Sequence, residues 1–490
     1  MATVARAMPR TNPWKKAYSI TLLNAFVFVV LAGTAYLRNV TSIQANCEIT
    51  AVFLVGSVIS SALLFRAGEG LVAIGFFVLG ASLTFGAGTL YGVVAPQDDI
   101  TRLLFSEDQQ ERLLATINFV NATSVFCVLI CAWPMMRFRA TNATMTSAIR
   151  SVVQDLSPYK TALIAASIVS VVLQILTFPQ ASNLLLRGVM NVTGRIPLII
   201  ILMIFARWSR ENAADKLIAI VITLALVLLG IISTSKTAAL LPLIAVIAGL
   251  WLGGGTRRLA LLLTAIGAVL YFMVLAPLTT AARLNTTYGN GLIGLNAGLQ
   301  NIVQAGQGLA PSSQKNQNVL SRFSSAPYQG YLIAQYQSGN RGHSLDDFWV
   351  ALVPRILWPD KPNVTRFGGK LYGQLNQTTA VSSQLAPTYS AEAYWNHGWV
   401  GLIAVSSLIG LQLGWLSQKW LDLVSGRSSR PGVLLLAVPI AFHGLWVETW
   451  IAATYIGGFV TLFVLITAVD AVMQPRRGPA ALRPFRGSNG

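Results

Sequence analysis

Residues 341–401 read RGHSLDDFWVALVPRILWPDKPNVTRFGGKLYGQLNQTTAVSSQLAPTYSAEAYWNHGWVG and form the most polar long stretch of an otherwise apolar chain. This stretch holds five of the 35 basic residues, four of the 17 acidic residues and two of the three histidines. The sequence on either side consists mostly of apolar runs, which are typical of membrane helices. The rest of the chain is therefore expected to be a bilayer scaffold that holds this stretch on one face of the membrane.

The composition of the whole chain indicates a membrane protein. Of its 490 residues, 54% are apolar and only 11% are charged, and the mean hydropathy is +0.60. A soluble domain usually carries about 25% charged residues. The net charge of +18 would also suit nucleic-acid binding, but most basic residues sit in short loops between apolar runs, where membrane proteins carry cytoplasmic Lys and Arg. No nucleic-acid partner is therefore expected.

Hydropathy predicts an all-α polytopic membrane protein with about 12 membrane-spanning helices. Residues 1–277 would hold nine spans, residues 278–398 a large ordered extracytoplasmic loop with short helices, and residues 399–490 three spans and a basic tail. The charge of the short loops places both termini in the cytoplasm. The predicted spans are 17–37, 49–65, 71–95, 114–134, 160–178, 195–207, 217–233, 238–253, 259–277, 399–417, 433–449 and 453–473.

One helix start can be predicted near the end of the outer loop. Thr388 or Ser390 is expected to cap a helix that runs into the span at 399–417. Residues four apart on a helix share a face, so Glu392 and Asn396 would point the same way at the membrane surface.

The predicted spans carry very few charges, which weighs against an ion-coupled transporter, because such proteins usually hold ionisable groups near the middle of the bilayer. Adjacent acids occur at Asp98–Asp99 and Asp346–Asp347. Adjacent side chains on a helix diverge by about 100°, so neither pair chelates a metal well unaided. No metal and no cofactor are expected.

The outer loop is rich in cations, with eight Lys and Arg against four acidic residues between positions 278 and 398. The planar fork of arginine binds phosphate oxygens in pairs, and lysine adds a point charge. A lipid-linked diphosphate at the outer leaflet is a natural partner, with contact to water or to anionic headgroups as the alternative. The candidate diphosphate-binding residues are Arg283, Arg341, Arg355, Lys361 and Arg366.

The loop also holds three candidate proton acceptors: Glu392, His397 and His343. A sugar hydroxyl loses its proton as it attacks an anomeric carbon, and a positioned base contributes roughly 10²- to 10⁴-fold to such a step. The alternatives are a salt bridge from Glu392 to a loop arginine and a hydrogen bond from His397 at a helix end.

Candidate sugar contacts lie beside these polar groups. They are Trp358, whose ring can stack on a sugar, and Tyr394 and Asn396, which can orient sugar hydroxyls. The alternative for the aromatic residues is the interfacial belt of Trp and Tyr that membrane proteins carry.

Two motifs in this loop resemble those of bacterial oligosaccharide repeat-unit polymerases, the Wzy-type O-antigen and exopolysaccharide polymerases. The first is PRILWPDKPN at 354–363 and the second is APTYSAEAYWNHGWVG at 386–401. The matching residues are Pro354, Arg355, Trp358, Pro359, Lys361 and Pro362 in the first motif, and Pro387, Thr388, Glu392, Tyr394, Asn396 and Gly398 in the second. Some polymerases of this type also carry an arginine, ten residues and a glycine in outer loops, and Arg283 with Gly294 fits that spacing.

The resemblance implies an architecture akin to the lipid-donor glycosyltransferases (GT-C-like), including O-antigen ligase. It also implies an inverting, metal-independent transfer on the periplasmic side of the bacterial inner membrane. The donor and acceptor would be undecaprenyl-diphosphate-linked oligosaccharides, and the expected partners are membrane lipids and a chain-length regulator protein. Two alternatives stay open: an O-antigen ligase-type glycan transferase, and a transporter or flippase of lipid-linked oligosaccharides.

Overall fold

The regular secondary structure of the described part of the chain is entirely helical. The computed structural model describes residues 13–67, 72–94, 106–136, 157–176, 194–233, 236–253, 257–270, 296–297, 299–300, 303–304, 326–353, 357–358, 361–362, 386–425 and 431–473. Within those ranges the only strand-like pairing is an isolated antiparallel bridge between Thr388 and Glu448. The expected all-α fold is confirmed for this part of the chain.

The helices fall into three groups along the sequence. The first is α1 (Pro13–Leu37), α2 (Ile43–Ala67), α3 (Ala73–Ala81), the π-helix η1 (Ser82–Ala87), α4 (Gly88–Val94) and α6 (Glu107–Ala132). The second is α8 (Lys160–Leu176), α10 (Ile196–Ala206), α11 (Ala213–Ile232), α12 (Lys236–Leu252) and α13 (Arg257–Leu270). The third is α16 (Ala326–Gln337), the 3₁₀-helix η8 (Phe348–Leu352), α18 (Tyr389–Val424), α19 (Pro431–Leu435), α20 (Ala437–Leu445), the π-helix η9 (Ala452–Gly458) and α21 (Phe459–Met473).

Seven of the described helical segments are long and apolar enough to cross a membrane: 13–37, 43–67, 73–94, 107–135, 213–232, 389–424 and 452–471. Helices α8, α10, α12 and α13 are apolar but shorter. The 11 residues of α10 extend only about 16 Å, half of a hydrocarbon core of about 30 Å. Helix α10 therefore does not cross a bilayer by itself, and its neighbours α8, α11 and α12 enclose nine consecutive buried residues, 197–205.

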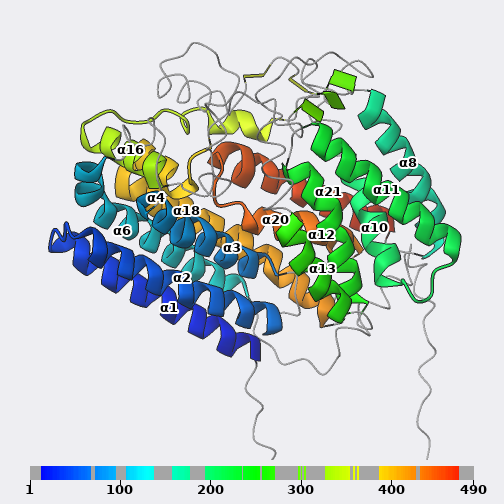
Figure 1. The fold of residues 1–490 in the computed structure, drawn as a ribbon, viewed down its shortest axis with the longest axis horizontal. Helices are drawn as coiled ribbons and strands as arrows, with labels where there is room; N and C mark the ends of the chain where they lie inside the picture. Colours follow the sequence, from blue (N-terminus) through cyan, green and yellow to red (C-terminus); the bar gives the residue numbers. More distant parts are fainter. Residues whose placement is uncertain are drawn as a thin grey trace, which may run out of the picture.

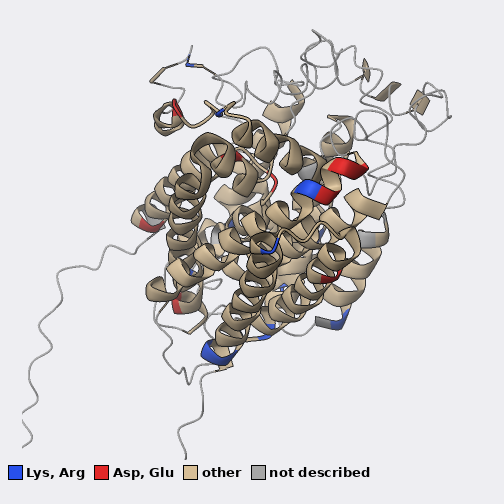
Figure 2. Cartoon of the chain, turned by 90° about the vertical axis from the view of Figure 1, so that its left-hand side faces the viewer, with Lys and Arg blue, Asp and Glu red and all other residues tan. Residues whose placement is uncertain are grey.

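Large apolar side chains face outward along the long helices. On α1 these include Leu23, Phe26 and Val30, and on α2 they include Val55 and Ile59. Soluble proteins rarely expose apolar patches of this extent to water, whereas contact with lipid tails avoids the free-energy cost of that exposure. Figure 2 shows how few charged residues interrupt the helical body. This surface is that of a polytopic membrane protein.

Helices α6 and α18 form the most extensive helix pair among the described elements, and glycines let them approach closely. Gly410 and Gly414 of α18 form a G-x-x-x-G pattern, which brings helix backbones together in membranes. A Cβ atom on Gly410 would collide with the carbonyl oxygen of Val128, and one on Gly414 would lie 2.7 Å from that of Ala132. In Figure 1, α1, α2 and α6 lie on one side of the molecule and α8, α11 and α13 on the other.

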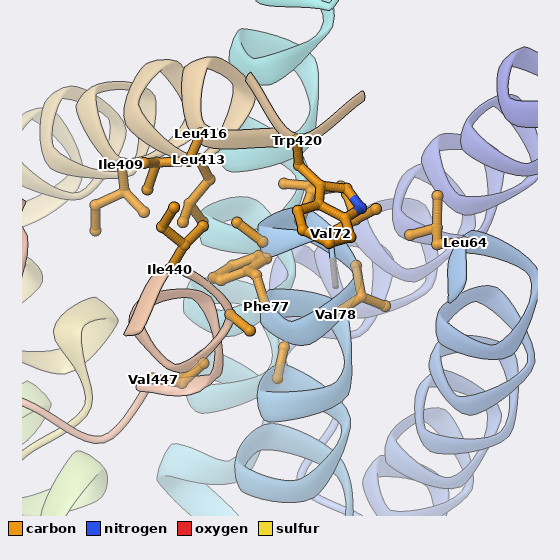
Figure 3. Close-up of a cluster of buried hydrophobic side chains, with 14 of the residues drawn as sticks. Leu64, Val72, Phe77, Val78, Ile409, Leu413, Leu416, Trp420, Ile440 and Val447 are labelled. Atoms are coloured by element: carbon orange, nitrogen blue, oxygen red, sulfur yellow. The ribbon is translucent and has the colours of Figure 1, made fainter. Parts of the chain in front are cut away.

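The apolar core between α3, α18 and α20 fixes the direction of α18. Figure 3 shows Ile409, Leu413 and Leu416 of α18 gathered with Phe77 of α3 and Ile440 of α20. All five side chains are fully buried. Helix α18 is thus held along its inner face, and its first turns project to the end of the molecule where α16 lies.

The span expected at 433–449 is not one continuous helix. The chain breaks at Leu436, between α19 and α20, and α20 ends before Trp446. The next residues run alongside the start of α18, where the Tyr389 N–H donates to the carbonyl oxygen of Val447 at 3.1 Å. This non-helical segment places the beginning of the last helix, which consists of η9 and α21 and starts at Ile451, next to the beginning of α18.

Candidate functional site

The start of α18 is formed as the sequence predicts. Thr388 is the N-cap, and its hydroxyl oxygen accepts a hydrogen bond from the Ala391 N–H at 3.3 Å. The sequence left Ser390 open as the alternative cap. Its hydroxyl instead donates to the Asn121 side chain of α6 at 2.9 Å, and Asn121 in turn donates to Gln329 of α16 at 2.8 Å. The first turn of α18 is therefore fixed to both α6 and α16.

Glu392 lies one turn into α18 with no exposed surface. One carboxyl oxygen accepts from the Ser344 hydroxyl at 2.8 Å and the other accepts from the Ile451 N–H at 2.7 Å. Ile451 begins the last helix, so the carboxyl group sits at a helix N-terminus, where negative charge is favoured. Among the residues that the structure describes, no Lys or Arg forms an ion pair with Glu392. Glu392 therefore ties together α18, the segment 341–347 and the last helix.

Asn396 lies on the same face of α18 as Glu392, as expected. Its amide nitrogen donates to the Ser344 hydroxyl oxygen at 2.9 Å, and its amide oxygen accepts from the Leu345 N–H at 3.2 Å. Asn396 is fully buried, so these bonds are shielded from water. The shared face of Glu392 and Asn396 thus fixes the segment 341–347 against α18.

A kink follows directly in α18, at His397 (φ −142°, ψ 20°) and Gly398 (φ 59°, ψ −144°). Only glycine adopts the Gly398 conformation without strain. Space is also short there, since a Cβ atom on Gly398 would collide with the phenol oxygen of Tyr336 on α16. The kink turns His397 to the surface, where its side chain makes no hydrogen bond with the described residues.

The exposed His397 borders a surface hollow of about 440 Å³ at the kink. The residues that line it are Tyr336, Arg341, Asn396, His397, Val400, Gly401 and Ala404. Three residues singled out from the sequence, Arg341, Asn396 and His397, thus come together although 55 positions separate Arg341 from Asn396. A cation and an imidazole at one open hollow can bind an anion and accept a proton beside it, whereas the Asn396 amide is already hydrogen-bonded to Ser344, Glu392 and Leu345.

Arg341 and His343 share the carboxylate of Asp346. His343 Nδ1 lies 2.8 Å from one carboxyl oxygen and Arg341 Nη2 donates to the other at 3.2 Å. These hydrogen bonds, from His343 first and then Arg341, hold the pKa of Asp346 below its usual value. All three side chains are exposed, so the contacts contribute little to stability. His343 does not line the hollow.

Lys361 and Trp358 do not line the hollow. The Lys361 ammonium donates to the carbonyl oxygens of Val350 at 3.1 Å and Val353 at 2.6 Å, at the end of η8. Trp358 stacks on Trp349 with ring centroids 5.9 Å apart. These contacts give both residues a part in holding the outer segment that follows α16.

Tyr394 is only 4% exposed and does not line the hollow. Its ring packs edge-on against Tyr336 and Trp399, at centroid distances of 5.2 Å in both cases. Tyr394 therefore supports the wall of the hollow from behind. Of the remaining predicted residues, Arg283, Arg355 and Arg366 lie outside the described residues.

Tyr336 was missed as a site residue by the sequence reasoning. Nothing in the local sequence shows that α16 brings Tyr336 to the kink of α18. In the parts of the chain that the structure covers, no three His, Cys, Asp or Glu side chains are grouped to hold a metal ion. Comparisons with protein-family models, with curated proteins and with solved structures found no match to this chain.

Proposed function

We propose that this protein is a glycosyltransferase that polymerises undecaprenyl-diphosphate-linked oligosaccharide repeat units into O-antigen or exopolysaccharide. The reaction takes place at the periplasmic face of the bacterial inner membrane, without a metal ion and with inversion at the anomeric carbon. The proposal rests on the hollow at the kink of α18, which both Arg341 and His397 line and which lies near the start of this long apolar helix. The two polymerase-like motifs supply the wider context, since the second motif forms this helix start.

The residues of the hollow have complementary roles in the proposed reaction. An acceptor hydroxyl oxygen attacks the anomeric carbon of the donor glycan, and His397 takes the hydroxyl proton. The bond from that carbon to the diphosphate oxygen breaks, and the lipid diphosphate leaves with the electron pair. Arg341 stabilises the charge on the leaving diphosphate, and fixed cations of this kind contribute several kcal/mol. The Asn396 amide holds the wall of the hollow.

Glu392 has a positioning role in this proposal, because its carboxyl oxygens already accept bonds from Ser344 and Ile451 and have no exposed surface. His343 does not line the hollow. His397 is therefore the favoured base of the three candidates. The same proposal includes diphosphate contacts by Arg283, Arg355, Lys361 and Arg366 and a sugar contact by Trp358. It also includes the twelve-span layout, the O-antigen ligase-like architecture and a chain-length regulator.

The test is purified protein incubated with a defined lipid-linked repeat unit, without added metal, and analysed for a ladder of products. We expect a ladder from the natural protein and its loss in His397→Asn. His343→Asn is the matched control and should keep the ladder, because His343 is exposed but does not line the hollow.

Each competing function gives a different result. An O-antigen ligase would transfer single units to a lipid A core and give no ladder. A flippase would move the lipid-linked unit across vesicles without lengthening it. Absence of a ladder together with either activity would overturn the polymerase proposal.

A further inference from the structure

Arg341 reaches the hollow from a short turn that follows α16. In this turn the Asn340 N–H donates to the carbonyl oxygen of Gln335 at 2.8 Å, and the Arg341 N–H donates to that of Gly339 at 3.2 Å. The Arg341 side chain is half exposed, so its ion pair with Asp346 at 3.2 Å contributes little. The position of the guanidinium therefore depends on how firmly the backbone of the turn is held.

Trp395 of α18 holds the backbone on both sides of Arg341. Its indole Nε1–H donates to the carbonyl oxygen of Asn340, the residue before Arg341, at 3.1 Å. Its own carbonyl oxygen accepts from the N–H of Gly342, the residue after Arg341, at 3.0 Å. One residue of α18 therefore brackets Arg341 with two hydrogen bonds, one from its side chain and one from its main chain.

The indole ring of Trp395 also packs directly on Gly342. A Cβ atom on Gly342 would lie 2.5 Å from the nearest atom of this ring, so a larger residue would push the turn away from α18. Gly342 is buried, whereas Arg341 beside it is exposed. Trp395 packs in addition on the small apolar cluster of Leu332 and Ala391, which joins α16 to α18. Packing thus fixes the turn together with the two hydrogen bonds.

These contacts distinguish Trp395 from a tryptophan of the interfacial belt, which turns its N–H toward water or headgroups. The N–H of Trp395 instead meets a backbone carbonyl oxygen, and the side chain is half-buried. Trp395 also lies two residues before His397, at the kink of the same helix. Its hold on the turn therefore sets the separation between the Arg341 cation and the His397 imidazole, which both line the hollow.

We propose that Trp395 is a positioning residue that fixes the Arg341 cation relative to His397 at the hollow. Trp395 does not line the hollow itself, so it acts through Arg341. A cation held in place stabilises a leaving diphosphate without having to reorganise as the bond to the anomeric carbon breaks. This role in the transfer rests on the proposed function, whereas the placement of Arg341 by Trp395 does not.

The first measurement follows the turn itself, in the purified full-length protein in lipid nanodiscs. Trp395→Phe keeps an aromatic ring and removes the N–H that donates to Asn340. Loss of one such bond should raise the open fraction of the turn about 5-fold, and hydrogen exchange of the Gly342 amide should become faster by that factor. Trp446→Phe is the matched control and should leave this exchange unchanged, because Trp446 is 43% exposed, packs on Phe442 and does not line the hollow.

The second measurement follows chain extension. Trp395→Phe should lower kcat about 3- to 10-fold and leave KM and the unfolding temperature unchanged, because a displaced cation stabilises the transition state less. In an Arg341→Gln background the same change should have no further effect, because Trp395 acts through Arg341. A tryptophan with only a structural role would lower the rate by the same factor in both backgrounds.

Unchanged hydrogen exchange at Gly342 in Trp395→Phe would overturn the proposal. An unchanged rate of extension, or an equal fall in both backgrounds, would overturn it as well. If Trp395→Phe does not fold, Gly342→Ala decides by the same criteria, because its Cβ displaces the turn from the ring. Hydrogen exchange needs no glycan transfer, so a protein with no product ladder would lose the polymerase function, and faster exchange in Trp395→Phe would still retain the placement of Arg341.

Discussion

Replacing Glu392 separates a positioning role from a proton-accepting one. Glu392→Gln keeps the size of the side chain and removes its charge. The amide oxygen can still accept from the Ile451 N–H, and the amide nitrogen can donate to the Ser344 oxygen, which leaves only the Ser344 hydroxyl proton without its acceptor. The expected cost is about 1 kcal/mol in the free energy of unfolding.

Glu392→Ala is the harsher change because it leaves two buried donors without acceptors. Each such donor costs about 1–3 kcal/mol, so the expected loss is ~2–6 kcal/mol. Natural proteins are stable by only about 5–15 kcal/mol, so this variant should accumulate poorly in the membrane. Glu48→Gln on the exposed face of α2 is the control for loss of a carboxylate and should change nothing.

The assay combines thermal unfolding in detergent with the product ladder. If Glu392 positions the segment 341–347, then Glu392→Gln keeps most of the activity and Glu392→Ala loses protein and activity together. If Glu392 is instead the base, then Glu392→Gln unfolds normally and loses about 10²- to 10⁴-fold in rate. That second result would refute the assignment of Glu392 to positioning.

Three further predictions concern the kink and the helix pair. His397→Asn should lower the rate of chain extension by about 10²- to 10⁴-fold while the unfolding temperature stays the same, because the ring is exposed; an equal fall in both would show a structural role instead. Gly398→Ala should destabilise the protein by about 1–3 kcal/mol, because φ 59° with ψ −144° is close to a conformation that only glycine adopts readily and because the new Cβ collides with Tyr336. Tyr336→Phe in the same chain should restore part of that loss; no recovery in thermal unfolding would mean that the backbone alone decides. Gly410→Leu should prevent α18 from packing on Val128 and abolish folded protein in size-exclusion chromatography, whereas Gly267→Leu on α13, where a Cβ meets nothing within 4 Å, should be tolerated.

The helical content and the start of α18 could be predicted from the sequence because both depend on local patterns. Apolar runs of sufficient length give membrane helices, and Thr388 followed by Glu392 and Asn396 gives a cap and a common helical face. The residues that this face contacts lie far away in the sequence. Ser344 lies 48 positions before Glu392 and Ile451 lies 59 positions after it, and no local pattern links them.

Three other features could not be predicted from the sequence, for related reasons. Hydropathy averages over a window, so the break at Leu436 is hidden by apolar residues on both sides. Arg195 looks like an ordinary charge at the start of an apolar run, and the sequence does not show that its Nη1 is buried. The outward orientation of His397 depends on the backbone conformation of Gly398, which a glycine permits but does not require.

The apolar residues at the rim of the hollow determine from which side it can be entered. Val400, just past the kink, is 78% exposed and lines the hollow together with Gly401 and Ala404, on the apolar part of α18. The opening is therefore continuous with the lipid-facing side of this helix. If the proposed function holds, a polyprenyl tail would remain among the acyl chains while its sugar head enters the hollow from the side, so neither proposed substrate would have to leave the bilayer between rounds of elongation.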